Sequence, residues 1–190
     1  MSTRLSAPLS ERDVRALELG ETVYIDGLVY TMRDAQHIRA QEYLEADRPL
    51  PVDLAGQIVY HCAPAYRETD DGYEILAGGP TTSERCNFFA PTLIEEFGVR
   101  ALAGKGGMDA DTRAAMAEHG CVYLTVPSIS AMIVDAIEDV EGRYWPDLHA
   151  ESIWVFQMDD FGPLTVTMDA HGNDRREETG DESIGTTYST

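Results

Sequence analysis

Lysine is almost absent from this sequence. Lys105 is the only lysine among 14 basic residues, whereas Asp and Glu together number 34, and the formal net charge is −20. A chain of this charge is not expected to bind nucleic acid, whose phosphates require a cationic partner. The acidic residues are spread along the chain, which indicates a heavily solvated surface. Such acidity also suits a protein that works at high salt, so we expect a halophilic habitat.

Long apolar runs are missing as well. No run approaches the roughly 18 residues that a membrane-spanning helix needs. Residues 1–15 are polar and charged, without the apolar region of a signal peptide. We therefore expect a cytoplasmic protein with no membrane partner.

Paired cysteine motifs are a third absence. Cys62, Cys86 and Cys121 show no C-x-x-C spacing, so the sequence supports neither a zinc nor a redox motif. Isolated cysteines of this kind are usually small buried hydrophobic residues, and we expect no metal ligand in this chain. The alternative is that the three cysteines together hold an iron–sulfur cluster with one open iron.

The patterns predict one α/β domain with a mixed sheet. We divide the 190 residues into a flexible lead-in (1–15), a folded domain (16–173) and an acidic disordered tail (174–190). A hairpin is predicted over 21–32 with its turn at Asp26-Gly27, and another turn at Gly162-Pro163. The predicted helices are 34–44, 91–97, 110–119 and 129–137, and the predicted strands are 58–60, 73–77, 99–103, 121–126, 153–156 and 164–168.

Three loops carry the candidate chemistry, and each follows a predicted strand. They are Arg33-Asp34, Thr81 to Arg85, and Gly104 to Gly107. Strand ends in an α/β domain often face one crevice, so we expect the cations Arg33, Arg85 and Lys105 to converge. Arginine pairs with carboxylate through two parallel hydrogen bonds, which favours a small dicarboxylate as ligand. Phosphate is less favoured, because the glycine–lysine loop lacks the P-loop spacing.

The stretch Gly78 to Arg85 admits two interpretations. Glycines followed by three hydroxyl residues suit close approach to an anion at the start of a helix or turn. The same residues also suit an ordinary capped turn between a strand and a helix. Among the histidines, His37 either orients Arg33 or packs in the core, and His61 is expected to pack.

Five short motifs, considered together with their order and spacing, go further than these patterns. They are Arg33-Asp34-x-x-His37, Gly79-Pro80-Thr81-Thr82-x-x-Arg85, Gly104-Lys105-Gly106-Gly107-Met108, Phe161-Gly162-Pro163-Leu164 and Asp169-x-His171-Gly172-Asn173. Over roughly residues 10 to 173 the chain resembles the β subunit, or C-terminal domain, of class I fumarate hydratases and L-tartrate dehydratases. Cys86 stands where that family often has methionine.

The resemblance implies a swivelling β/β/α domain with a mixed sheet and flanking helices. It implies the β subunit of a two-component hydro-lyase that acts on a 2-hydroxy dicarboxylate. The favoured reaction interconverts malate and fumarate of the tricarboxylic acid cycle, and L-tartrate is the alternative substrate. The cofactor of this hydro-lyase is a [4Fe-4S] cluster, expected on an α subunit in an α2β2 assembly and not on this chain. An alternative function, of a different class, is a regulatory domain that binds dicarboxylates without catalysing a reaction.

The resemblance also assigns roles to residues. Arg33, Arg85 and Lys105 match substrate-carboxylate contacts, and Lys105 is also a catalytic candidate because its charge can assist Thr81. Thr81 matches the proposed base for the C3 proton, although a hydroxyl is a poor base without a neighbouring cation, and orienting the substrate is the alternative. Three further residues are expected to lie in a second layer around the site and to position these groups: Asp34, His37 and Thr82.

Overall fold

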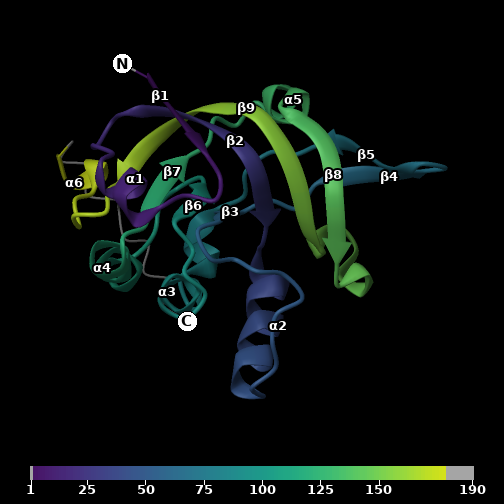
Figure 1. Cartoon of the computed structure of the whole chain (residues 1–190), viewed down its shortest axis with the longest axis horizontal. Helices are drawn as coiled ribbons and strands as arrows, with labels where there is room; N and C mark the ends of the chain where they lie inside the picture. Colours follow the sequence, from purple (N-terminus) through teal and green to yellow (C-terminus); the bar gives the residue numbers. More distant parts are fainter. Residues whose placement is uncertain (1, 179–190) are drawn as a thin grey trace, which may run out of the picture.

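A seven-stranded mixed sheet dominates the computed structural model, which describes residues 2–178 (Figure 1). The strands run in the order β1-β2-β3-β6-β7-β9-β8. Strand β2 also pairs with β9, so the sheet closes on itself like a barrel. The sheet strands are β1 Ser2–Ser6, β2 Thr22–Thr31, β3 Ile58–Tyr60, β6 Ala101–Gly104, β7 Val122–Thr125, β8 Ile137–Tyr144 and β9 Ile153–Met168.

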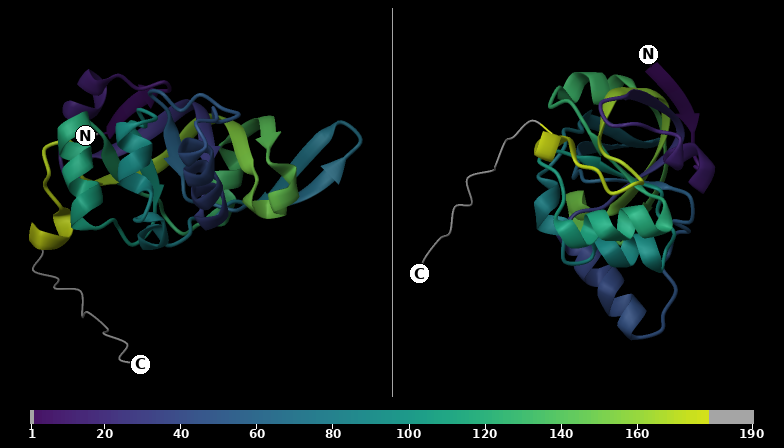
Figure 2. Two further views of the ribbon diagram at one scale, coloured as in Figure 1. Left: turned by 90° about the horizontal axis from the view of Figure 1, so that it is seen from below. Right: turned by 90° about the vertical axis from the view of Figure 1, so that its left-hand side faces the viewer.

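Short helices surround the sheet, and a separate two-stranded hairpin projects from one end of the molecule (Figure 2). The hairpin strands are β4 Ala65–Thr69 and β5 Gly72–Ala77. The helices are α1 Glu11–Arg15, α2 Asp34–Glu45, η1 Ser83–Cys86, α3 Ala90–Glu95, α4 Ala110–His119, α5 Ser130–Asp135, η2 Pro146–Glu151 and α6 Arg175–Glu178. Within residues 2–178, no helix has the length and apolar character needed to cross a membrane.

Side-chain alternation along the strands builds two cores. In β6, Ala101 and Ala103 pack into the core enclosed by the curved sheet. Leu102 between them faces the second core, under α3 and α4. This alternation follows from the two-residue period of a strand, and it makes each central strand apolar throughout. The predicted mixed sheet with flanking helices is confirmed.

The N-terminal region corrects the sequence prediction. Residues 1–15 were expected to be a flexible lead-in, but β1 pairs with β2 in parallel and α1 begins with a capping box between Ser10 and Asp13. Val14 of α1 is buried in the barrel core, which anchors the segment. A single apolar residue per turn gives too weak a period to be read from sequence. At the other end, residues 175–178 of the predicted disordered tail form α6, and residues 179–190 lie outside the described residues.

Two predicted turns are also wrong. Asp26-Gly27 does not reverse the chain: β2 runs through it with a register shift between Ile25 and Gly27. Gly27 has φ +98° and lies against the backbone of Ala7, so this glycine forms part of a β-bulge and not of a hairpin turn. Gly162-Pro163 does not reverse the chain either: β9 continues through this dipeptide, and β9 pairs with β2.

Candidate active site

The parallel strands bring the candidate loops to one edge of the sheet. Strands β2, β3 and β6 are parallel, and Thr31, Tyr60 and Ala103 stand opposite one another in register. Arg33 follows the first strand by two residues, whereas His61 and Lys105 directly follow the second and the third. Because carboxyl ends of parallel strands share an edge, all three loops leave the sheet at the same place.

The Thr81 loop is fastened to this edge by backbone hydrogen bonds. The Thr81 amide and hydroxyl both donate to the His61 carbonyl, each at 2.8 Å. Thr82 and Lys105 form a parallel bridge, in which the Lys105 amide donates to Thr81 O at 3.3 Å and the Ser83 amide donates to Lys105 O at 2.9 Å. Thr81 and Lys105 therefore hold fixed backbone positions relative to each other.

Glycines make this close approach feasible. Gly106 has φ +92°, a conformation that other residues rarely adopt, so the loop after Lys105 depends on it. Gly104 is required for a different reason: a Cβ there would lie 2.1 Å from Ser83 Oγ and 3.2 Å from His61 Nδ1. The glycines around Lys105 thus allow strand β6 and the Thr81 loop to pack in direct contact.

Arg33 is the most enclosed of the three cations. Its side chain is only 18% exposed, and it lies 3.9 Å from a carboxylate oxygen of Glu151. Its buried Nε finds no hydrogen-bond partner among the described residues. The helix behind it is firmly anchored, because Gln36 Nε2 donates to Ser152 O at 2.9 Å and Ala35 N donates to Glu151 at 3.2 Å. Arg33 therefore offers a fixed guanidinium with an unused donor.

Arg85 is more exposed, at 57%, and forms an ion pair with Asp34. That ion pair links the start of α2 to the Thr81 loop, so it holds Arg85 beside Arg33. Lys105 is exposed at the third loop. The site is therefore less positive than the three cations alone would make it, because the carboxylates of Asp34 and Glu151 lie among them. These carboxylates position the guanidinium groups, and they lower the net positive charge of the site.

A buried polar chain lies beneath the Thr81 loop. His61 Nδ1 contacts Ser83 Oγ at 2.8 Å, and Ser83 Oγ contacts the Tyr123 hydroxyl at 2.8 Å. All three residues are fully buried. Burial holds the pKa of His61 well below its usual value, so the imidazole is neutral. Sequence reasoning assigned His61 only to packing, and the position of this histidine directly after a buried strand was the available signal.

His37 lies beside the arginines on the first turn of α2. Its Nδ1 makes a short hydrogen bond with the Arg33 carbonyl oxygen, so the imidazole holds the backbone of Arg33. Complete burial lowers the pKa of His37 to about 4, and the ring is neutral near pH 7. Thr82 contributes through its backbone bridge to Lys105.

The three cysteines do not gather into a cluster site. All three are buried and unpaired. Cys62 packs in the core inside the barrel, whereas Cys121 packs in the core under the helices, on the opposite face of the sheet. One iron–sulfur cluster cannot bind both, so these residues do not fit the cofactor that the resemblance implies.

Comparison with known proteins identifies the family. The model of the family described as fumarase C-terminus matches residues 1–179. The chain therefore belongs to this family, and the resemblance seen in its motifs is confirmed.

Three relatives illustrate the match. A protein of Geobacillus stearothermophilus, provisionally named a class I fumarate hydratase, is 41% identical over 183 residues, which are 95% of this chain but 34% of that protein. The L(+)-tartrate dehydratase subunit beta of Escherichia coli K12 is 34% identical over 175 residues, 91% of this chain and 86% of the relative. A Methanocaldococcus jannaschii protein, provisionally given the same subunit name, is 35% identical over 173 residues, 90% of this chain and 89% of the relative.

These coverages differ in an informative way. The chain spans about a third of the Geobacillus protein (34%) and most of the tartrate dehydratase subunits (89% and 86%). It is therefore similar in extent to a separate β subunit, and it corresponds to only one part of the longer protein.

Proposed function

We propose that this chain is the β subunit of a two-component hydro-lyase that interconverts (S)-malate and fumarate. The observation that carries the proposal is the shared sheet edge. Arg33 and Lys105 follow the parallel strands β2 and β6 there, and the Thr81 loop is joined to this edge by its bridge to Lys105. The 41% identity to the Geobacillus protein favours malate and fumarate over L-tartrate, which remains the alternative substrate.

The cations suit the charge of the reaction. Removing a proton next to a carboxylate places negative charge on that carboxylate, and fixed cations stabilise it most in the transition state. The buried Nε of Arg33 has no hydrogen-bond partner within residues 2–178, and a substrate carboxylate at this guanidinium would supply one. Arg85 and Lys105 would contact the remaining carboxylate oxygens. The two carboxylates beside the arginines orient these groups before the substrate arrives.

Thr81 is proposed to contact the substrate at the carbon that loses the proton. Its hydroxyl donates to the His61 carbonyl, which fixes the direction of the oxygen lone pairs. A carbonyl cannot take up the hydroxyl proton, so a base role for Thr81 requires a cation to stabilise its alkoxide. Lys105, paired through its backbone with the Thr81 loop, is proposed to supply that charge.

An α subunit is the proposed partner, by analogy with the relatives named as β subunits. Two large apolar side chains are exposed beside the arginines: Ile38 at 51% and Phe88 at 52%. Phe88 packs against His37, with ring centroids 6.3 Å apart, so this apolar surface borders the site. We propose that the α subunit covers it in an α2β2 assembly and holds the [4Fe-4S] cluster, since the cysteines of this chain are not placed to do so.

The test is an anaerobic assay of this chain with and without its α subunit. We expect no turnover by the chain alone, and hydration of fumarate when the two are mixed. L-tartrate and D-tartrate test the alternative substrate, and lactate, which has one carboxylate, is the matched control that should not react. Turnover by the chain alone, or a complex inactive on every hydroxy dicarboxylate, would contradict the proposal. Tight malate binding by the isolated chain, with an inactive complex, would favour a regulatory domain.

A further inference from the structure

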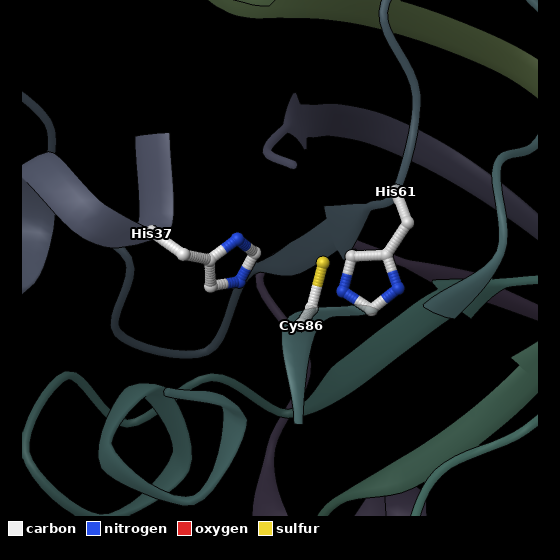
Figure 3. Close-up of side chains that lie close together, drawn as sticks. All are labelled: His37, His61 and Cys86. Atoms are coloured by element: carbon white, nitrogen blue, oxygen red, sulfur yellow. The ribbon is translucent and has the colours of Figure 1, made fainter. Parts of the chain in front are cut away.

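A group of three buried side chains lies behind the cationic loops and is not used by the proposed function. His37, His61 and Cys86 come from α2, the end of β3 and η1, three segments that are distant in sequence (Figure 3). One ligand atom from each lies within 4.8 Å of the other two. Among the described residues this is the one group in which three such side chains meet this closely.

The free nitrogens of both histidines are available for coordination. His37 Nδ1 bonds the Arg33 carbonyl, and because a carbonyl only accepts, this nitrogen carries the proton. His61 Nδ1 is bonded to Ser83 Oγ at 2.8 Å. Both Nε2 atoms are completely buried and have no hydrogen-bond partner in the described structure. Such orphaned buried nitrogens are costly unless something binds them.

The second contacts of these histidines resemble the support seen around metal ligands. A metal-binding imidazole usually fixes its other nitrogen on a backbone carbonyl, carboxylate or hydroxyl, which sets its tautomer and ring direction. Here a carbonyl holds His37, and the Ser83–Tyr123 pair holds His61. Both rings are neutral, as coordination requires. Figure 3 shows the imidazoles facing the Cys86 sulfur from either side.

We propose that His37 Nε2, His61 Nε2 and Cys86 Sγ bind one Zn²⁺ ion. Two imidazoles and one thiolate are ligands that zinc prefers, at about 2.0–2.1 Å for nitrogen and about 2.3 Å for sulfur. Tetrahedral geometry would draw the outermost atoms together by about 1 Å. Three protein ligands leave a fourth position for water or another small ligand.

Charge and proton balance are consistent with this assignment. Burial raises the pKa of the Cys86 thiol to about 12, so the thiol is protonated before the metal arrives. On binding, the S–H proton leaves to solvent and the thiolate bonds the ion, with no change in oxidation state. The site then carries one net positive charge, and the charged groups within electrostatic range of Cys86 are two carboxylates, Asp34 and Glu151, and two guanidinium groups, Arg33 and Arg85. The ion would tie together the segments that carry Arg33 and Arg85.

This inference reverses an expectation drawn from the sequence, which predicted no metal ligand in the chain. The three residues are separated by 24 residues and then 25, so no local spacing reveals them. The inference does not rest on the proposed function, because it concerns this chain alone.

The test is metal titration of the full 190-residue chain, reduced, stripped with a chelator and kept free of oxygen. Co²⁺ serves as the optical probe, and Zn²⁺ affinity is measured by competition with a chromophoric chelator. We expect one equivalent of Co²⁺ to bind and to produce a thiolate-to-cobalt charge-transfer band, which Zn²⁺ then removes. Absence of stoichiometric binding by the wild-type chain would overturn the proposal by itself.

Variants assign the ligand. Cys86→Ala is expected to lose the charge-transfer band and at least about 100-fold in Zn²⁺ affinity, the upper end of what outer-shell changes alone cost. Cys121→Ala is the matched control, another buried unpaired cysteine, and it should keep both. Zn²⁺ should raise the melting temperature of the wild type and of Cys121→Ala but not of Cys86→Ser. Equal binding and an equal band in Cys86→Ala would overturn the assignment.

Discussion

Replacing Arg33 with alanine is expected to lower kcat/KM of the reconstituted enzyme by about 30- to 5,000-fold. The estimate corresponds to about 2–5 kcal/mol, the usual cost of removing one partner from a buried, hydrogen-bonded charge pair, at about 1.4 kcal/mol per tenfold. Arg33 justifies such a value because its side chain is 18% exposed and its Nε has no partner in the described part of the chain. Steady-state kinetics under anaerobic conditions provide the measurement.

Stability separates this role from a structural one. Among the described salt bridges, Arg33 forms only a 3.9 Å ion pair with Glu151, whose side chain is 32% exposed, so loss of this pair should cost little folding free energy. Arg33→Lys should recover only part of the activity, since an ammonium lacks the planar fork. Arg113, an arginine of α4 that pairs with Glu177, is the matched control, and Arg113→Ala should leave kcat/KM within about threefold. Near-normal activity of Arg33→Ala would remove Arg33 from the site.

Gly104→Ala is expected to have the second largest effect, and here both stability and activity should fall. The added methyl group would lie 2.1 Å from Ser83 Oγ, an atom held at 2.8 Å by both His61 and Tyr123. Overpacking of this kind costs about 1–3 kcal/mol, and the fixed position of Ser83 places this site at the upper end. Because Ser83 also donates its amide to Lys105, relief of the clash would move the Thr81 loop.

Denaturant unfolding of the variant chain measures the stability loss, and the anaerobic assay measures the activity. Gly79→Ala is the stability control, because the nearest atom to its new methyl group is 3.9 Å away and its φ is not positive. We expect that control to unfold within about 0.5 kcal/mol of wild type. If Gly104→Ala unfolds like Gly79→Ala and keeps full activity, the packing of Ser83 against β6 does not hold the loop.

The position of the Arg33 and Lys105 loops at one edge could be predicted because it depends on topology alone. Both loops follow apolar strands, and parallel strands bring such loops to one edge without any knowledge of packing. The Thr81 loop instead follows β5 of the separate antiparallel hairpin and is joined to the edge by its bridge to Lys105. The helix 110–119 was equally accessible, since Asp109 caps it and Gly120 ends it in the left-handed conformation. Such a helix can be predicted from its cap residues because the tertiary fold here keeps the structure that the local sequence favours.

Other features could not be predicted because the tertiary fold overrides the local pattern. Asp26-Gly27 has the composition of a turn, yet pairing of β2 on both edges keeps the strand continuous. In α2 the apolar Ile38 is 51% exposed, because the helix projects from the body and buries Gln36, His37 and Ala40 instead (Figure 1). The sequence pattern predicts burial only where the helix lies along the core.

The site shows the same limit. The sequence placed Arg33, Arg85 and Lys105 near one another but did not reveal the carboxylate of Glu151, which comes from a segment 118 residues after Arg33. The grouping of His37, His61 and Cys86 was likewise invisible, because it depends on how α2, β3 and η1 pack. Contacts between distant segments require the three-dimensional structure.

The most direct test of the central claim is a crystal structure of the complex with the α subunit and a non-reacting dicarboxylate such as succinate. The account requires that one carboxylate lie at hydrogen-bond distance, about 2.7–2.9 Å, from the Arg33 guanidinium, and that Arg85 and Lys105 contact the same acid. Succinate bound at another place, with all three cations directed away from it, would contradict the account.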